Sequence, residues 1–169
     1  MILAICGFMG SGKTTTGRSL AARLGWRFAD LDSEIEKAAG RSVAQIFEDE
    51  GEAAFRKRET EALRAILVDA DAPLVLALGG GTLIAEENRQ LVRRHCRCVW
   101  LKASPEALSE RLAHEAEGRP LLAGQDLRTR VATLLASREA TYREAADVAV
   151  DTDGVDPEEI VKRIIEILR

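Results

Sequence analysis

The sequence lacks three features that would set it apart from ordinary soluble proteins. It has no apolar stretch as long as a membrane span, and its first apolar run begins directly after Met1 with no signal peptide before it. It also lacks an excess of positive charge, because the formal net charge is -4 at pH 7. That balance argues against a broad nucleic-acid-binding surface. We therefore expect a cytosolic protein that binds small molecules, without nucleic acid or membrane.

Cysteine is scarce, and the three present do not form an even set that would indicate a disulfide framework. The run from His95 to Cys98 has the appearance of a metal-binding segment. However, the sequence contains no second ligand pair to complete a tetrahedral zinc site. Cys96 and Cys98 also begin an alternating apolar strand. We interpret them, with Cys6, as reduced thiols.

The chain alternates apolar runs with helical patterns, and it has no internal repeat or Pro-rich linker. The apolar runs are residues 2–6, 27–30, 74–78, 96–101 and 147–150. The helical patterns are residues 13–24, 33–39, 43–50, 52–70, 86–94, 105–115, 126–143 and 157–168. This alternation predicts βαβ crossovers, a parallel sheet with helices on both faces, and ligands at the carboxyl ends of the strands. A length of 169 residues suits a single domain, 1–169.

A glycine-rich loop, GFMGSGKT, joins the first apolar run to the first helical pattern. Its spacing, Gly7-x-x-x-x-Gly12-Lys13-Thr14, fits the P-loop. In that motif backbone N–H groups surround phosphate oxygens, the lysine reaches the β- and γ-phosphates, and the Thr hydroxyl binds Mg²⁺. The following helix would direct its positive end at the same phosphates. The alternative is a glycine-rich turn that carries a lysine by chance, but the flanking strand and helix favour the P-loop.

The acidic partner of a P-loop is predicted at the end of the second apolar run. The third run, where such an aspartate is common, continues instead into the glycines at 79–81. The second run ends in Asp30 and Asp32, which an extended segment would place on one face. One carboxylate would then face the metal and the other an acceptor hydroxyl. Alternatively, Asp32 or Ser33 is only the N-cap of the next helix.

The triple glycine and three arginines indicate where an acceptor would bind. Three consecutive glycines exceed what a simple strand-to-helix turn needs, and they allow a ligand to approach backbone amides closely. Arg56 and Arg58 follow Phe55 in a helical pattern, and only one of them can share its inward face. With Arg138, a converging pair would bind a carboxylate, because a guanidinium matches that group in a bidentate way. Each of these arginines can equally be a solvated surface cation.

Residues 114–125, HEAEGRPLLAGQ, interrupt two helical patterns. They contain two glycines and a proline, with Arg119 between them. This composition predicts a mobile lid.

Six segments together resemble the shikimate kinase family: GFMGSGKT, FADLD, GEAAFRKRE, LGGGT, GRPLL and SREATY. They occur in the family's order and spacing along the whole chain. The resemblance implies a three-layer α/β P-loop NTPase fold, like that of nucleoside monophosphate kinases, with a five-stranded parallel sheet in the order 2-3-1-4-5. It also implies transfer of the γ-phosphoryl group of ATP to the 3-hydroxyl of shikimate, on the route to chorismate and the aromatic amino acids. One Mg²⁺ ion would accompany ATP. Nothing in the sequence requires a second subunit, so we expect a monomer.

The resemblance further implies roles for individual residues. Lys13, Asp32 and Arg119 would be catalytic, with Asp32 holding the attacking hydroxyl, and Thr14 and Asp30 would support Mg²⁺. The residues implied to bind ATP are Gly10, Ser11, Gly12, Lys13, Thr14, Thr15, Arg111 and Arg119. Those implied to bind shikimate are Asp32, Arg56, Gly79, Gly80, Gly81 and Arg138, in or beside a shikimate-binding region at 33–60.

Adenine would lie between Arg111 and residues 153–157. Here the sequence departs from the family, because DTDGVDP has no cation at the turn where some members carry one.

Two other functions fit parts of this pattern. A P-loop kinase for gluconate or a nucleoside monophosphate would share the donor half of the site, and gluconate also carries a carboxylate. The combination of FADLD, GEAAFR and GGG favours shikimate. A nucleotide-dependent switch would need the guanine-reading string Asn-Lys-x-Asp, which does not occur.

Overall fold

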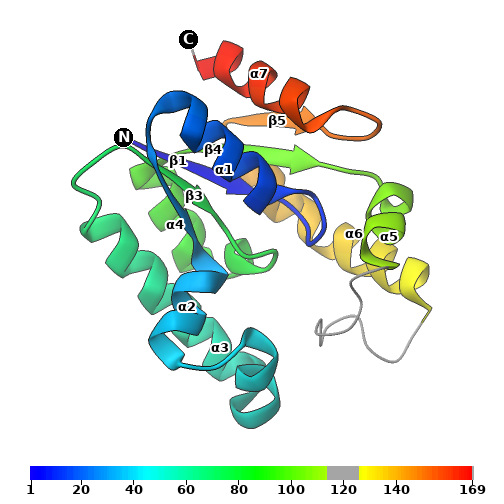
Figure 1. Ribbon diagram of the computed structural model, residues 1–169. Helices are drawn as coiled ribbons and strands as arrows, with labels where there is room; N and C mark the ends of the chain where they lie inside the picture. The colour runs from blue at the N-terminus through cyan, green and yellow to red at the C-terminus, as the bar shows by residue number, and fades with distance from the viewer. Residues whose placement is uncertain (114–125, 169) are drawn as a thin grey trace.

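A computed structural model describes residues 1–113 and 126–168 of the chain (Figure 1). The strands are β1 (Ile2–Cys6), β2 (Arg27–Asp30), β3 (Leu74–Ala77), β4 (Cys96–Lys102) and β5 (Val148–Asp151). The helices are α1 (Lys13–Leu24), α2 (Leu31–Ala39), α3 (Val43–Val68), α4 (Glu86–His95), α5 (Pro105–Ala113), α6 (Leu127–Ala145) and α7 (Pro157–Leu168), with a short 3₁₀ helix, η1 (Thr82–Ile84). Within the described residues, the ends of the strands lie within one residue of the predicted ones, and the helix ends lie within two.

The strands form one parallel sheet in the order β2-β3-β1-β4-β5, as predicted. β1 lies at the centre because its sequence, ILAIC, is apolar at every position and can be buried on both faces. Its side chains alternate between two cores. Leu3 and Ile5 face the layer containing α1 and α7, while Ala4 and Cys6 face the layer built by α3 to α6. The three-layer fold is therefore confirmed.

Helix α3 differs from the prediction of two separate helices. It runs continuously from Val43 to Val68, but Gly51 has φ 82° and ψ 173°, which are not helical values. A glycine tolerates this left-handed φ, so the two predicted segments meet at a kink. Ser42 caps the start of the helix, accepting a hydrogen bond from the Gln45 N–H at 3.2 Å.

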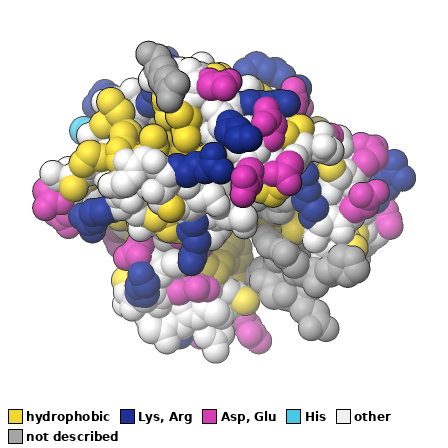
Figure 2. Space-filling model, turned by 45° about the horizontal axis from the view of Figure 1, so that its top comes forward, with side chains coloured by type: hydrophobic (Ala, Val, Ile, Leu, Met, Phe, Trp, Pro, Cys, Tyr) yellow, Lys and Arg dark blue, Asp and Glu magenta, His cyan; other side chains and the backbone are white. Residues whose placement is uncertain are grey.

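The surface carries charges of both signs. Figure 2 shows Lys and Arg side chains interspersed with Asp and Glu side chains across the visible face, which agrees with the small net charge. No helix within the described part of the chain has both the length and the apolar character needed to cross a membrane.

Candidate active site

The loop between β1 and α1 has a backbone that depends on its glycines. Gly7, Gly10 and Gly12 all have positive φ, at 146°, 79° and 89°. At Gly7 a side chain would also have no room, because a Cβ would lie 2.6 Å from the carbonyl oxygen of Leu101. Gly12 ends the loop directly before the first residue of α1. The loop therefore meets the helix N-terminus in the arrangement that binds phosphate.

The cation and the hydroxyl of the motif lie at the start of α1. The Lys13 ammonium donates a hydrogen bond to the carbonyl oxygen of Phe8 at 2.9 Å, so it reaches back across the loop. The Thr14 hydroxyl donates to Asp30 Oδ2 at 2.6 Å, which joins the P-loop to the end of β2. A hydroxyl and a carboxylate held together are hard oxygen ligands of the kind that Mg²⁺ prefers. Thr14 and Asp30 therefore fit the metal-binding role expected of them.

The two aspartates do not share one face of an extended segment, and that prediction is wrong. Asp30 ends β2, whereas Asp32 lies in the first turn of α2, which begins at Leu31. Asp30 is the N-cap of this helix, because its Oδ1 accepts a hydrogen bond from the Ser33 N–H at 3.2 Å. The alternative in which Asp32 or Ser33 is the cap is therefore also wrong. Because Asp30 caps the helix, the Asp32 carboxylate is available for other contacts.

Asp32 has an unusual protonation equilibrium. Its pKa is raised from the ordinary value of 3.8 to about 6, mainly by burial and then by the nearby carboxylates of Glu59 and Asp30. Lys13 and Arg56 oppose the shift. A carboxylate whose pKa lies near neutrality is suited to accept a proton from a substrate hydroxyl.

Glu59 is a residue that the sequence reasoning missed. It is completely buried, and its two oxygens accept hydrogen bonds from the Thr82 hydroxyl at 2.7 Å and from Arg56 Nη1 at 2.8 Å. The spacing of Arg56 and Glu59 by three helical positions was visible in the sequence. However, such pairs are common on exposed helix surfaces, so spacing alone does not indicate a buried site.

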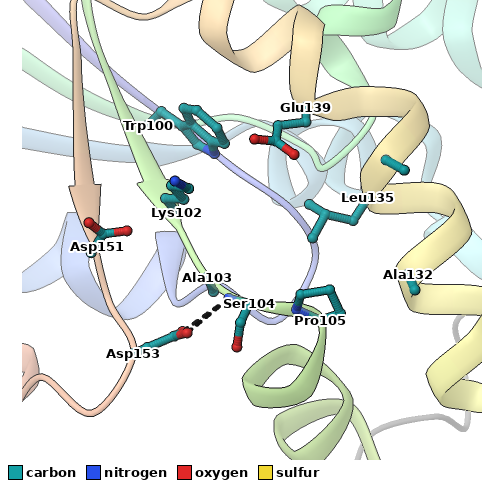
Figure 3. Close-up of a pocket in the computed structure, with 11 residues that line it drawn as sticks. Trp100, Lys102, Ala103, Ser104, Pro105, Ala132, Leu135, Glu139, Asp151 and Asp153 are labelled. Carbon is teal, nitrogen blue, oxygen red and sulfur yellow. Dashed lines mark hydrogen bonds between the residues drawn. The ribbon is translucent and has the colours of Figure 1, made fainter.

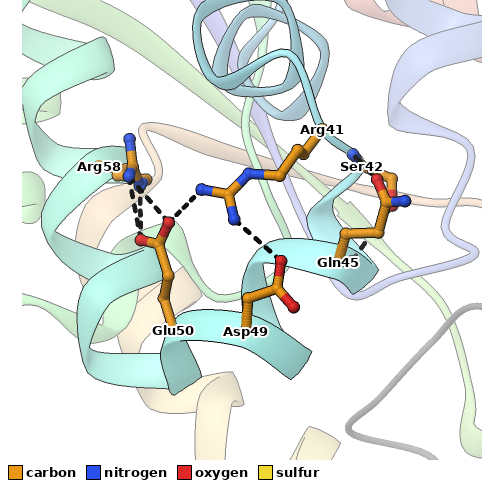
Figure 4. Close-up of polar contacts among 6 residues, drawn as sticks. All are labelled: Arg41, Ser42, Gln45, Asp49, Glu50 and Arg58. Atoms are coloured by element: carbon orange, nitrogen blue, oxygen red, sulfur yellow. Dashed lines mark hydrogen bonds and ion pairs between the residues drawn. The ribbon is translucent and has the colours of Figure 1, made fainter.

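The two candidate arginines of α3 point in different directions. Arg56 carries a side chain that is 20% exposed and turns inward to Glu59. Arg58 forms two-pronged contacts at 3.0 Å with Glu50, across the kink at Gly51, and Glu50 also pairs with Arg41 (Figure 4). Arg58 therefore belongs to a surface cluster, and only Arg56 reaches the candidate site.

The triple glycine lies between these inward groups. None of its three residues has a positive φ, so the need for glycine is steric. A Cβ on Gly79 would lie 2.8 to 2.9 Å from side-chain oxygens of Glu59, Asp32 and Thr82, and one on Gly81 would lie 2.3 Å from Arg56 Nη2. The missing side chains therefore allow these polar groups to close around the backbone.

Arg138, on α6, approaches the triple glycine from the opposite side. It is only 4% exposed, and its Nη1 donates to the carbonyl oxygen of Gly80 at 3.4 Å. Tyr142 also donates to this carbonyl through its hydroxyl. Arg138 also lies over the Phe8 ring, but it forms no ion pair with any residue in the described part of the chain. A buried cation normally has an anionic partner, so this guanidinium is prepared for an anionic ligand.

One cavity connects the phosphate loop with the acceptor groups. It has a volume of about 470 Å³. Its lining includes Lys13, Thr14, Asp30, Asp32 and Gly80. The donor and acceptor halves predicted from separate segments are therefore parts of one space at the carboxyl ends of the strands.

A second cavity, of about 340 Å³, opens on the other side of the loop. Arg111 and Val155 line it, and so does Thr15, which the first cavity shares. Arg111 donates to Thr152 Oγ1 at 3.3 Å, to Thr152 O at 3.2 Å and to Gly10 O at 3.4 Å. The buried Thr152 was not singled out from the sequence, because a lone threonine at a strand end carries no distinctive signal.

Two of the sequence-based predictions fall on residues that the structure does not describe. The predicted lid, residues 114–125, and Arg119 within it lie outside the described residues. The described groups nevertheless provide a phosphate loop, a carboxylate whose pKa lies near neutrality, and a buried guanidinium without an anionic partner among the described residues. Such a set suits phosphoryl transfer to a hydroxyl on an anionic molecule.

Comparison with known sequences points to one family. A family model described as shikimate kinase matches residues 9–169. A shikimate kinase from Ruegeria pomeroyi is 44% identical over 98% of this chain and 84% of its own length. Another, from Symbiobacterium thermophilum, is 43% identical over the whole of this chain and 97% of its own.

Solved structures give the same result. A shikimate kinase from Acinetobacter baumannii in complex with shikimate superposes with a TM-score of 0.93 at 35% identity, covering 99% of this chain and 92% of the other. A shikimate kinase from Aquifex aeolicus gives a TM-score of 0.81 at 33% identity, covering 99% and 96%. Both similarities extend over the sheet and the elements that carry the candidate site.

Proposed function

This chain belongs to the shikimate kinase family, and on that premise we propose how its residues transfer the γ-phosphoryl group of ATP to the 3-hydroxyl of shikimate. The products are shikimate 3-phosphate and ADP. The observation that carries the proposal is Arg138, a buried guanidinium with no anionic partner among the described residues, beside the same cavity as the phosphate loop. The carboxylate of shikimate would supply the missing negative charge.

The donor half of the site is the loop before α1. Backbone N–H groups at Gly10, Ser11 and Gly12 bind the phosphates, and Lys13 leaves the Phe8 carbonyl to contact the β- and γ-phosphates. Ser11 supports this role, because its hydroxyl is buried without a hydrogen-bond partner among the described residues. Thr15 extends the lining beyond the loop.

Thr14 and Asp30 are the residues proposed to hold Mg²⁺. Their 2.6 Å hydrogen bond supports this, because it holds the two oxygens side by side. When bound with ATP, the ion would neutralise charge on the β- and γ-phosphates. Arg111 is proposed to border the adenine, together with residues 153–157, at the second cavity.

The acceptor half holds shikimate through its hydroxyl and its carboxylate. Asp32 accepts a hydrogen bond from the attacking hydroxyl and takes its proton as the phosphoryl group arrives. Its raised pKa supports this, because the ionised form is a competent acceptor near neutral pH. Arg56 and Arg138 bind the carboxylate, and residues 79–81 form the floor between them. We propose that the shikimate-binding region covers residues 33–60 within one domain, 1–169.

Arg119 is proposed to neutralise charge on the transferring phosphoryl group, and residues 114–125 to close over it. This part rests on the family resemblance. We also propose that the chain acts as a monomer, since every group invoked above comes from one chain.

An acceptor screen tests the proposal. Purified protein with ATP and Mg²⁺ should release ADP when shikimate is added, and the phosphorylated product should be identified by mass spectrometry. Gluconate and a nucleoside monophosphate are the matched comparisons, because each is an acceptor of a related P-loop kinase. Turnover with either of these and none with shikimate would overturn the assignment of the acceptor.

A further inference from the structure

A third cavity lies away from the P-loop, at the carboxyl ends of β4 and β5 where they face α6. Its volume is about 370 Å³, and none of its described lining residues lines the P-loop cavity. Trp100, Lys102 and Asp151 come from the two strands, and Leu135 and Glu139 come from α6 (Figure 3). Of the described residues to which a substrate contact is assigned above, only Asp153 also lines this cavity.

The indole of Trp100 is the first sign that a ligand binds here. The residue is 5% exposed, and its N–H forms no hydrogen bond with any described residue. Figure 3 shows the ring nitrogen on the side that faces the cavity. The ring nitrogen is not one of the unpaired side-chain atoms that are fully buried, so it is accessible from the cavity, where an indole N–H favours an acceptor. The cavity therefore presents a donor that lacks its acceptor.

Two opposite charges beside this donor are also unpaired. Lys102 has its ammonium 5.9 Å from the centre of the Trp100 ring, and it forms no ion pair within the described residues. Asp151, which neighbours Lys102 in the β4–β5 register, likewise forms none there. The other two carboxylates of the cavity are already engaged: Glu139 by Arg143 at 2.8 Å, and Asp153 by the Ser104 N–H at 3.1 Å.

The remaining wall is apolar. Pro105 and Leu135 form part of it, together with alanines of α6 and of the β4–α5 connection. The cavity thus combines an apolar surface with an indole N–H and with an exposed cation and an exposed anion, none of which has a hydrogen-bond or ion-pair partner within the described residues. A pocket of this kind binds a ligand with an apolar body that a few polar groups orient.

We propose that this cavity is a binding site for a small zwitterion with an apolar body, of which a neutral aliphatic amino acid is the simplest example. The ligand's carboxylate accepts from the Trp100 N–H and pairs with Lys102, and its ammonium pairs with Asp151. The proposal does not depend on the kinase reaction. The site does border the acceptor pocket, because the Trp100 ring packs 5.9 Å from that of Tyr142, which holds the Gly80 carbonyl.

Trp100 itself reports occupancy. The chain has two tryptophans, so a Trp26→Phe variant leaves Trp100 as the only indole. Titration of this variant with L-leucine or L-methionine should give a saturable change in fluorescence, with a dissociation constant of about 1 mM for ligands of this size. Two matched probes each lack one charge: 4-methylpentanoate lacks the ammonium of leucine, and 3-methylbutylamine lacks the carboxylate. Each should bind about tenfold more weakly or worse.

Variants locate the binding. Lys102→Met and Asp151→Asn, each in the Trp26→Phe background, should weaken leucine binding by about tenfold. Glu61→Gln, at an exposed position on α3, is the matched control and should leave it unchanged. Two results would overturn the proposal. The first is no saturable signal from either amino acid up to about 30 mM. The second is that the charge-deficient probes bind as tightly as leucine and that both cavity variants bind leucine as tightly as the Trp26→Phe parent. Kinase turnover, measured in parallel on the same samples, keeps this result separate from that of the acceptor screen.

Discussion

Asp32 and Glu59 face each other across the backbone of Gly79. A Cβ on this glycine would lie 2.9 Å from Asp32 Oδ1 and 2.8 Å from Glu59 Oε1, so only a hydrogen atom fits between the two carboxylates. Their proximity raises the pKa of Asp32, in addition to the larger effect of burial. The same Glu59 holds Arg56 at 2.8 Å. One buried glutamate therefore influences both the proposed base and a proposed carboxylate-binding residue.

The first prediction concerns the pH dependence of turnover. Asp32 must be ionised to accept the hydroxyl proton, and its pKa is about 6 in the free enzyme. We expect kcat/KM for shikimate to fall about tenfold per pH unit below pH 6. ADP affinity, measured over the same range by calorimetry, controls for effects on nucleotide binding. A profile that stays level down to about pH 4.5 would contradict the role given to Asp32.

Removing the charge of Glu59 should shift the pH profile of kcat/KM for shikimate. In Glu59→Gln the side chain keeps its size and its partners Thr82 and Arg56, but the repulsion that raises the pKa of Asp32 is lost. We expect the acid limb to shift to lower pH, with a higher KM for shikimate because Arg56 is held less firmly. Glu52→Gln is the matched control, since Glu52 also pairs with Arg56 but is half exposed. If the acid limb of the pH profile lies at the same pH in both variants, Glu59 does not cause the raised pKa of Asp32.

Asp32→Asn should separate activity from stability. We expect kcat to fall about 10²–10⁴-fold, because the proton acceptor is lost. The raised pKa means that the folded chain binds the Asp32 proton more tightly than the unfolded chain. Ionised Asp32 therefore lowers the free energy of unfolding, with no loss below about pH 4 and the full loss above about pH 6.

The variant should consequently gain about 1–2 kcal/mol at pH 7.5 and little at pH 4, by urea denaturation. This gain is smaller than the pKa shift alone implies, because Asp32 is only partly buried. A lower stability at pH 7.5 would mean that Asp32 supports the fold.

Arg138→Met tests the unpaired guanidinium. We expect KM for shikimate to rise about 30-fold or more, since a charge-assisted contact worth about 2–4 kcal/mol is lost, while KM for ATP changes little. The ligand-free variant should be no less stable than the parent, because a buried unpaired charge is replaced by an apolar side chain. Arg58→Met is the matched control, since Arg58 pairs with Glu50 on the surface. Equal effects of the two substitutions on KM for shikimate would contradict the role of Arg138 in binding the carboxylate of shikimate.

Gly79→Ala tests the close approach at the triple glycine. The added methyl group would lie within 3 Å of three side-chain oxygens, so Asp32, Glu59 and Thr82 must move apart. We expect a loss of about 1–3 kcal/mol in stability and a strong loss of kcat/KM for shikimate. Gly40→Ala is a useful comparison, because nothing lies within 4 Å of its Cβ position and only its left-handed φ opposes the change. It should therefore lower stability without a selective effect on shikimate.

The strands, the helices and the phosphate loop were predictable because their signals are local. Apolar runs and helical periods set the elements, and the spacing from Gly7 to Thr14 carries the P-loop within eight consecutive residues. The strand order came from the resemblance of six segments to one family. The prediction failed where backbone geometry changed within one residue: α2 begins at Leu31, so Asp30 becomes the cap and Asp32 turns into the helix.

By itself, the sequence determined the P-loop, the parallel α/β architecture and the positions of the candidate catalytic groups, because each depends on residues close together in the chain. Tertiary structure alone decided which groups meet. It turned Arg56 inward and Arg58 outward, and it brought Thr82 to Glu59 across 23 positions of sequence. It also left Arg138 without an anionic partner, and the Trp100 N–H without an acceptor, among the described residues. These outcomes depend on how helices pack against the sheet, and side-chain burial and pairing are settled only by that packing.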